Sequence, residues 1–293
     1  MCKGEAVATL ADVVQVLDEL YPPATAASWD QVGLVSGDLS QTVGHVRFAV
    51  DPTLEVIEAA RDDGVDLLVT HHPLLLRGVH SVATTHAKGA ALTALIVADV
   101  ALYCAHTNAD VARPGVNDAL AAACGLTAVS ALSREGDQEL GLVGDLPAPI
   151  PLREFAIRLA SALPPTPVGL RVAGPAEAQV RRVAVLGGAG DDRFDQVRAC
   201  AADVYVTADL RHHPALEARQ EARGGTPYLI DAGHFATESL WLAPAAARLT
   251  AVLEQRGITV ETSVSALRTD PWDFLVGQRP DDVGQDPQDK ESQ

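Results

Sequence analysis

The chain has 293 residues, more than the roughly 100 to 200 common for one domain, which predicts two domains or two halves of one. Hydrophobic residues make up 47% of it but aromatic residues only 4%, so the core must consist mainly of Val, Ala and Leu, as in helix-covered parallel sheets. A formal net charge of -17 repels phosphate backbones and argues against broad nucleic-acid binding.

The first half of the chain alternates strands and helices after an opening helix. Residues 7–20 repeat apolar positions at helical spacing, and a loop follows them. A strand, a helix, a buried strand, a second helix and a third strand are then predicted at 46–50, 53–64, 65–70, 86–98 and 100–105. His71 and His72 stand directly after the buried strand, and His106 and Asp110 follow the third strand.

The second half repeats this order of elements. Strands and helices alternate at 182–187, 193–201, 203–207, 214–223 and 227–232. Each half also ends on a histidine and an acid at the same spacing, in His106-x-x-x-Asp110 and His234-x-x-x-Glu238. We therefore predict an α/β fold of two similar halves, built from pseudo-duplicated βαβ units with helices flanking mixed or parallel sheets.

The domain boundaries follow from changes in composition. The first α/β half is expected at 1–130 and the second at 180–265. The proline-rich text at 131–179, with one helical stretch, is interpreted as a connector. Residues 266–293 have little apolar periodicity and are expected to form a disordered acidic tail.

Polar side chains gather after the carboxyl ends of the predicted strands, where ligand sites form in open α/β sheets. Three imidazoles and two carboxylates are candidate metal ligands: His71, His72, Asp110, His234 and Glu238. These groups suit zinc, iron, manganese or nickel. One catalytic ion takes about three protein ligands, so five predict two divalent ions bridged by a carboxylate, at a site between the halves.

A second pair of histidines needs a different interpretation. His71 and His72 follow Thr70 immediately, whereas His212 and His213 stand several residues beyond Thr207 and cannot occupy equivalent space. We expect His212 and His213 to contact the substrate or to support the ligands from outside the ligand set. The alternative for this pair is a solvated loop without a role in the site.

Six segments of the sequence resemble a known family in the same order. They are SWDQVGLVSGD, GVDLLVTHHPLLLRGV, AHTNADVARPGVNDALA, VAVLGGAGDD, VYVTADLRHH and DAGHFATE, within about residues 5 to 260. The chain is similar to the Nif-three-like dinuclear metal-centre proteins, which carry the name GTP cyclohydrolase 1 type 2 homologue. The resemblance implies the same five ligands, His106 as a further histidine lining the site, and a toroidal homohexamer. Gln31 and Ala208 depart from the residues usual in the family.

The ligand set and the resemblance together predict a metal-dependent hydrolase. Two bridged ions lower the pKa of a shared water toward neutrality, and His106 is the candidate catalytic residue that transfers protons. The resemblance implies GTP as the small-molecule substrate, with opening of its imidazole ring and release of formate. Two alternatives stay open, a metal-dependent phosphoesterase and a non-enzymatic metal-binding scaffold or regulatory protein.

The sequence also predicts a compartment. Its four cysteines are scattered and form neither a zinc motif nor a disulfide framework. The N-terminus lacks a signal-peptide pattern, and no run of about 18 apolar residues is present to span a bilayer. We expect a cytoplasmic protein without a membrane partner.

Overall fold

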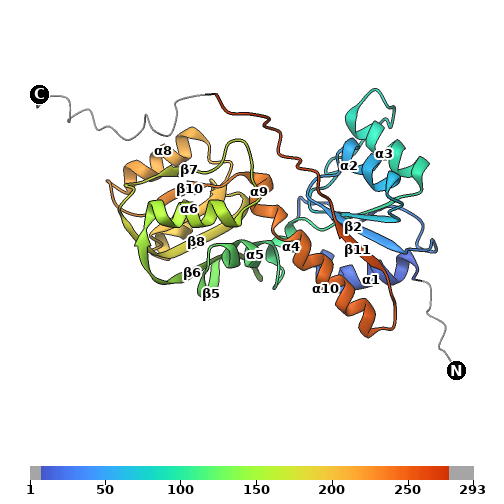
Figure 1. Cartoon of the computed structure of the whole chain (residues 1–293), viewed down its shortest axis with the longest axis horizontal. Helices are drawn as coiled ribbons and strands as arrows, with labels where there is room; N and C mark the ends of the chain where they lie inside the picture. Colours follow the sequence, from blue (N-terminus) through green and yellow to red (C-terminus); the bar gives the residue numbers. More distant parts are fainter. Residues whose placement is uncertain (1–7, 277–293) are drawn as a thin grey trace, which may run out of the picture.

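Two mixed sheets organise the chain, and helices cover both faces of each (Figure 1). The computed structural model describes residues 8–276. Each sheet with its helices is called a lobe below, the first built on the five-stranded sheet and the second on the six-stranded sheet. Within residues 8–276, no helix is both long and apolar enough to cross a membrane.

The first lobe is built on a sheet with four parallel strands and one antiparallel edge strand. In spatial order these are β1 (Gly33–Ser36), β4 (Ala101–Cys104), β3 (Leu67–Thr70), β2 (His45–Ala49) and β11 (Glu261–Val264). One face packs against α1 (Leu10–Leu20) and α10 (Leu242–Gln255), and the other against α2 (Leu54–Asp62) and α3 (Ala87–Ala98). Every residue of β3 and β4 is buried, which explains their continuous apolar sequence.

Helix α1 shows how the local sequence fixes an element of this lobe. Thr9 and Asp12 form a capping box, in which each side chain bonds the backbone of the other. The buried residues of the helix recur at helical spacing: Leu10, Val13, Val16, Leu17 and Leu20. The predicted opening helix is therefore confirmed, and its apolar face lies on the sheet.

The second lobe contains three parallel strands extended by antiparallel neighbours. In spatial order the strands are β5 (Thr127–Glu135), β6 (Gln138–Pro151), β8 (Gln179–Ala189), β9 (Val204–Ala208), β10 (Tyr228–Asp231) and β7 (Arg171–Ala173). Strands β8, β9 and β10 are parallel. Helices α5 (Val116–Ala123) and α6 (Leu152–Ala162) cover one face, and α7 (Phe194–Ala199) and α8 (His212–Glu221) cover the other.

The two lobes share an order of strands. The units β2-α2-β3-α3-β4 and β8-α7-β9-α8-β10 each end on a strand with an antiparallel partner, β1 or β7. Helix α4 (Thr107–Val111) follows β4, and α9 (His234–Ser239) follows β10. The two His-x-x-x-acid segments therefore begin equivalent helices in the two lobes.

The boundaries of the lobes differ from the sequence expectation. Residues 131–179, interpreted as a connector, include β6, α6 and β7, which belong to the second lobe. Three of the prolines that suggested a connector, Pro147, Pro149 and Pro151, lie in the last part of β6, where the pairing with β8 shifts between Asp145 and Ile150. Helix α10 and strand β11 return to the first lobe, where β11 pairs with β2. Contacts distant in sequence therefore set boundaries that composition did not show.

The segment after β11 also differs from the expectation. Residues 266–276 extend from the first lobe toward the second, although we expected a disordered tail from residue 266 (Figure 1). Leu267 packs against the core beneath α2 and α3, and the Thr269 hydroxyl donates to the Asp51 carboxylate. The rest of the predicted tail, 277–293, lies outside the described residues.

Candidate metal centre

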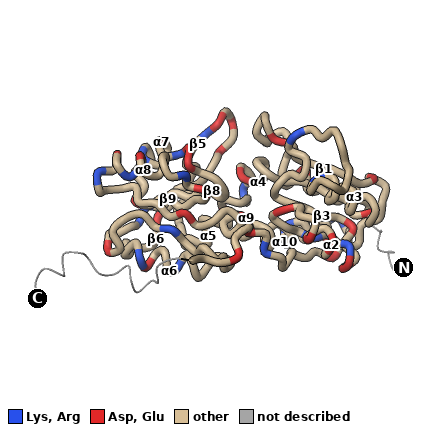
Figure 2. The backbone as a smooth tube through the Cα atoms, turned by 90° about the horizontal axis from the view of Figure 1, so that it is seen from above, with Lys and Arg blue, Asp and Glu red and all other residues tan. Residues whose placement is uncertain are grey.

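The predicted site residues meet between the two lobes. His71 and His72 follow β3, and His106 precedes α4 in the first lobe, whereas α9 carries His234 and Glu238. Helices α4 and α9 lie between the lobes in the view from above (Figure 2). The carboxyl ends of parallel strands thus bring both halves of the sequence to one place, as the sequence pattern predicts.

The Glu238 carboxylate is the centre of this cluster. Its Oε1 atom lies 3.4 Å from His71 Nε2 and 3.0 Å from His234 Nε2. Its Oε2 atom lies 3.1 Å from His72 Nε2, and the two Nε2 atoms of His72 and His234 are 3.2 Å apart. Asp110 Oδ1 lies 3.8 Å from His71 Nε2. The five candidate ligands therefore form one group.

Four imidazoles of the cluster are held by their Nδ1 atoms. The partners are Ala105 O for His71 (3.0 Å), Asp51 for His72 (2.7 Å), Asp30 for His106 (2.9 Å) and Asp209 for His234 (2.8 Å). An acceptor at Nδ1 selects the neutral tautomer whose Nε2 lone pair is free. The rings are thus oriented with Nε2 available as a metal ligand.

The unpaired donor atoms fit bound cations. His71 Nε2 and Asp110 Oδ1 are buried and have no hydrogen-bond partner within the described part of the chain. Two groups of side chains each place their donor atoms within 4.8 Å of one another. One group is His71, His72 and His106, and the other is His72, His234 and Glu238, so His72 belongs to both. Buried unpaired polar atoms are costly, and imidazole with carboxylate suits divalent transition ions. The cluster is therefore consistent with metal binding.

Neighbouring charges shift the pKa values of the clustered side chains. Burial lowers the pKa of His72, but Asp51 and Glu238 outweigh it and raise the pKa to about 10. Burial acts in the same way on His234, where Asp209 and Glu238 raise the pKa to about 11. Burial raises the pKa of Glu238, yet the surrounding imidazoles hold it well below its usual range. Cations must displace these protons, so metal affinity should rise with pH.

Three carboxylates that hold the imidazoles were not predicted from the sequence. Asp51 lies just past the end of β2, after Val50, so the strand-end rule that indicated the candidate ligands also applies to it. Asp30 follows Trp29 in the loop before β1. Asp209 stands directly after β9 with a positive φ of 54°, and its carboxylate is hydrogen-bonded to His234 Nδ1. Their partners depend on the tertiary fold, so spacing alone did not reveal them.

The remaining histidines separate into two cases. His106 was expected to transfer protons, and it lies inside a possible ligand group with His71 and His72. His212 and His213 are exposed at the start of α8 and belong to neither donor group. The contact of this pair with a substrate stays a prediction, and Asp209, in the turn after β9, is the residue near them that bonds a candidate ligand.

A cavity of about 860 Å³ opens onto the cluster. Among the residues that line it are His106, Asp110 and Glu238, together with Trp29 and Lys88. Its volume falls within the range of about 300 to 1,000 Å³ typical of small-molecule sites. The indole of Trp29 is 60% exposed and stands edge-on to His106, with ring centroids 5.8 Å apart.

Gly188 keeps space open beside the Glu238 carboxylate. A Cβ atom at Gly188 would lie 2.4 Å from Glu238 Oε1, and the φ of 68° disfavours a side chain. We expect Gly188→Ala to displace the carboxylate and weaken zinc binding by at least about 10-fold, the lower end for a lost supporting contact. Chelator competition measures this affinity.

Gly64→Ala is the matched control for this substitution. Gly64 has a φ of 66°, and a Cβ atom added there would meet no other atom within 4 Å, so backbone strain is similar and the metal cluster is untouched. Each change costs about 1 to 2 kcal/mol of backbone strain. Equal zinc affinities for the two variants would show that the space beside Glu238 does not matter.

The fold and the site define an α/β protein with two mixed sheets and a histidine and carboxylate cluster suited to metal ions. The chain belongs to the Duf34/NIF3 (NGG1p interacting factor 3) family, which it matches over residues 8–271. The resemblance seen in the sequence is thereby confirmed.

Named relatives and a solved structure support this assignment. The chain is 48% identical to a GTP cyclohydrolase 1 type 2 homolog of Streptomyces coelicolor, over 92% of this chain and 96% of the relative. It is 35% identical to a protein of the same name from Mycobacterium tuberculosis, over 90% of this chain and 97% of the relative. A hypothetical protein of Staphylococcus aureus has a similar structure, with a TM-score of 0.84 at 29% identity, over 92% of this chain and 100% of that one.

Proposed function

We propose that this protein is a dinuclear metal-dependent hydrolase that acts on a small anionic molecule. One observation carries the proposal. The Glu238 carboxylate of the second lobe contacts imidazoles of both lobes at a cavity large enough for a small substrate. A purely structural ion pair would not need unpaired donor atoms such as His71 Nε2 and Asp110 Oδ1 beside it.

The cluster supplies enough ligands for two ions. His71, His72, Asp110, His234 and Glu238 would hold two divalent cations, with zinc, iron and manganese as the candidates. Bound cations of this kind lower the pKa of water and polarise a substrate oxygen. The buried carboxylates and oriented rings keep these donors in place before substrate binds.

His106 is positioned to transfer a proton at the cavity. Its Nδ1 atom is held by Asp30, so Nε2 is the atom available to accept and return a proton. Burial raises the pKa of Asp30, but hydrogen bonds from His106 and Thr107 outweigh it and keep this carboxyl ionised. Asp30 therefore orients the ring.

One basic side chain of the cavity offers a contact for an anionic group of a substrate, beside the acids Asp110, Glu135, Asp192 and Glu238. Lys88 and Arg193 are the basic side chains that line it. Arg193 pairs with Glu135 and with Asp192, whereas Lys88 has no ion pair within 4.0 Å among residues 8–276. Lys88 is also the one lysine of these residues. The Lys88 ammonium and the exposed Trp29 ring suit a molecule that has a planar ring and an anionic group. GTP, which appears in the name of the relatives, is such a molecule.

Turnover by defined metal forms tests this proposal. Protein loaded with zinc, manganese or iron is incubated with GTP, and formate and ring-opened product are measured. A parallel series with phosphate monoesters and diesters tests the phosphoesterase alternative. We expect metal-dependent turnover of one class of substrate, either GTP or the phosphate esters. Fully loaded protein that converts neither class would instead support the non-enzymatic scaffold.

A further inference from the structure

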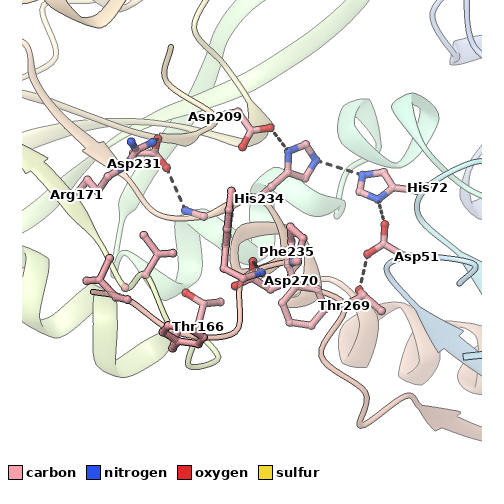
Figure 3. A pocket seen from close by; sticks show the side chains of 17 residues that line it. Asp51, His72, Thr166, Arg171, Asp209, Asp231, His234, Phe235, Thr269 and Asp270 are labelled. Carbon is pink, nitrogen blue, oxygen red and sulfur yellow. Dashed lines mark hydrogen bonds and ion pairs between the residues drawn. The ribbon is translucent and has the colours of Figure 1, made fainter. Parts of the chain in front are cut away.

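A second cavity of about 720 Å³ lies on the other side of His72 and His234. Its wall contains an unbroken chain of side chains from Asp209 through His234, His72 and Asp51 to Thr269 (Figure 3). The last member belongs to the segment after β11. The far end of the described chain is thus hydrogen-bonded to a candidate metal ligand through one carboxylate.

Asp51 is held from two sides. Its Oδ1 atom lies 2.7 Å from His72 Nδ1, and its Oδ2 atom accepts a hydrogen bond from the Thr269 hydroxyl. These are the hydrogen bonds of the Asp51 side chain within residues 8–276. The orientation of the carboxylate, and therefore of the His72 ring, depends on Thr269.

The pairing of β11 places Thr269 at this position. Val264 is in register with Phe48 on β2, and the Ser265 amide donates to the Phe48 carbonyl at 2.8 Å. Asp51 lies just past the end of β2, and Thr269 lies past the end of β11. Parallel strands advance in the same direction, so both segments reach the metal cluster together.

The other carboxylates that hold imidazoles are secured differently. Asp30 accepts hydrogen bonds from the Thr107 amide at 3.0 Å and from the Thr107 hydroxyl, and Thr107 is the neighbour of His106 itself. Asp209 stands in the turn directly after β9. The Asp51 contact instead joins residues that are 218 positions apart. Of these rings, His72 therefore relies on the contact that spans the most sequence.

We propose that Thr269 is a positioning residue of the metal centre and that residues 265–276 form part of that centre. The Thr269 hydroxyl fixes Asp51, and Asp51 fixes His72 with Nε2 toward His234 and Glu238. This role rests on the proposed metal centre. Coupling between two events is reciprocal, so bound metal must also stabilise the docked segment.

Zinc release to a chelator tests the role of Thr269. Thr269→Val removes the hydroxyl and keeps the shape, whereas Thr269→Ser keeps the hydroxyl. We expect Thr269→Val to release one zinc ion roughly 10-fold faster than the unchanged protein, because loss of an outer partner costs about 10 to 100-fold in metal affinity. Thr269→Ser should release zinc at the original rate.

Thr262→Val is the matched control. Thr262 lies on β11 and its hydroxyl pairs with that of Thr250 at 2.8 Å, away from the cluster. If Thr269 contributed only to stability and did not position Asp51, both variants would release zinc at similar rates. Zinc should also protect the segment 265–276 from proteolysis in the unchanged protein, and Thr269→Val should reduce that protection.

Two results would overturn the proposal in distinguishable ways. Equal zinc release from Thr269→Val and Thr262→Val, with two ions bound by the unchanged protein, would remove the positioning role and leave the metal centre standing. An unchanged protein that binds no zinc would remove the metal centre and the role of Thr269 with it.

Discussion

Glu238→Gln should lose at least one of two bound metal ions, with a decrease in affinity of more than about 100-fold. Removing a residue that only supports a ligand costs roughly 10 to 100-fold in metal affinity. The loss here should be larger, because Glu238 is itself a candidate ligand. Its carboxylate lies within 3.4 Å of His71, His72 and His234. An amide keeps the shape but removes the charge and one acceptor. Metal content after dialysis and chelator competition measure the change.

Glu254→Gln is the control for this substitution. Glu254 is an exposed residue of α10 and forms no ion pair within the described residues. It should retain two ions with unchanged affinity. If Glu238→Gln bound both ions as tightly as the control, Glu238 could not be a ligand, and His234 would be the remaining candidate ligand from the second lobe.

Trp241→Ala should destabilise the metal-free protein by about 3 to 5 kcal/mol, the usual cost of truncating a buried aromatic residue. Trp241 is 1% exposed and packs against Tyr21, Phe48 and His71, with ring centroids 5.3, 6.1 and 5.7 Å away. Its indole N–H donates to the Tyr21 hydroxyl at 3.2 Å. Urea unfolding of the metal-free protein measures the loss.

The position of Trp241 links the core to the cluster. Its amide donates to the Glu238 carbonyl at 3.0 Å, so the residue joins α9 to α10. Trp272→Ala is the control, because that indole is 62% exposed and its loss should change stability by less than about 0.5 kcal/mol. Similar small losses for both variants would show that the interface between α9, α10 and the first sheet is not part of the core.

Much of the ligand set could be predicted because it follows a local rule. The ends of buried strands are recognisable from apolar runs, and His71 and His72 stand directly after β3, whereas Asp110 lies in the short helix that follows β4. The matching His-x-x-x-acid segments then indicated which residues of the second half are candidate ligands, namely His234 and Glu238. The structure brings all five candidate ligands together, as expected from the meeting of strand ends.

Features that depend on distant contacts could not be predicted in this way. The return of β11 to the first lobe follows from its pairing with β2, which no local pattern encodes. Thr269 lies in a segment without periodicity, because single side-chain contacts hold it rather than a buried face. His212 and His213 were expected outside the ligand set, and they are exposed at the start of α8.

Anomalous X-ray diffraction from crystals of zinc-loaded protein tests the two-ion centre most directly. We expect two zinc peaks per chain between the end of β3 and helix α9, enclosed by ligands from both lobes. No peak in this cluster, or peaks that leave Asp110 and Glu238 at separate sites, would contradict the existence of a shared metal centre.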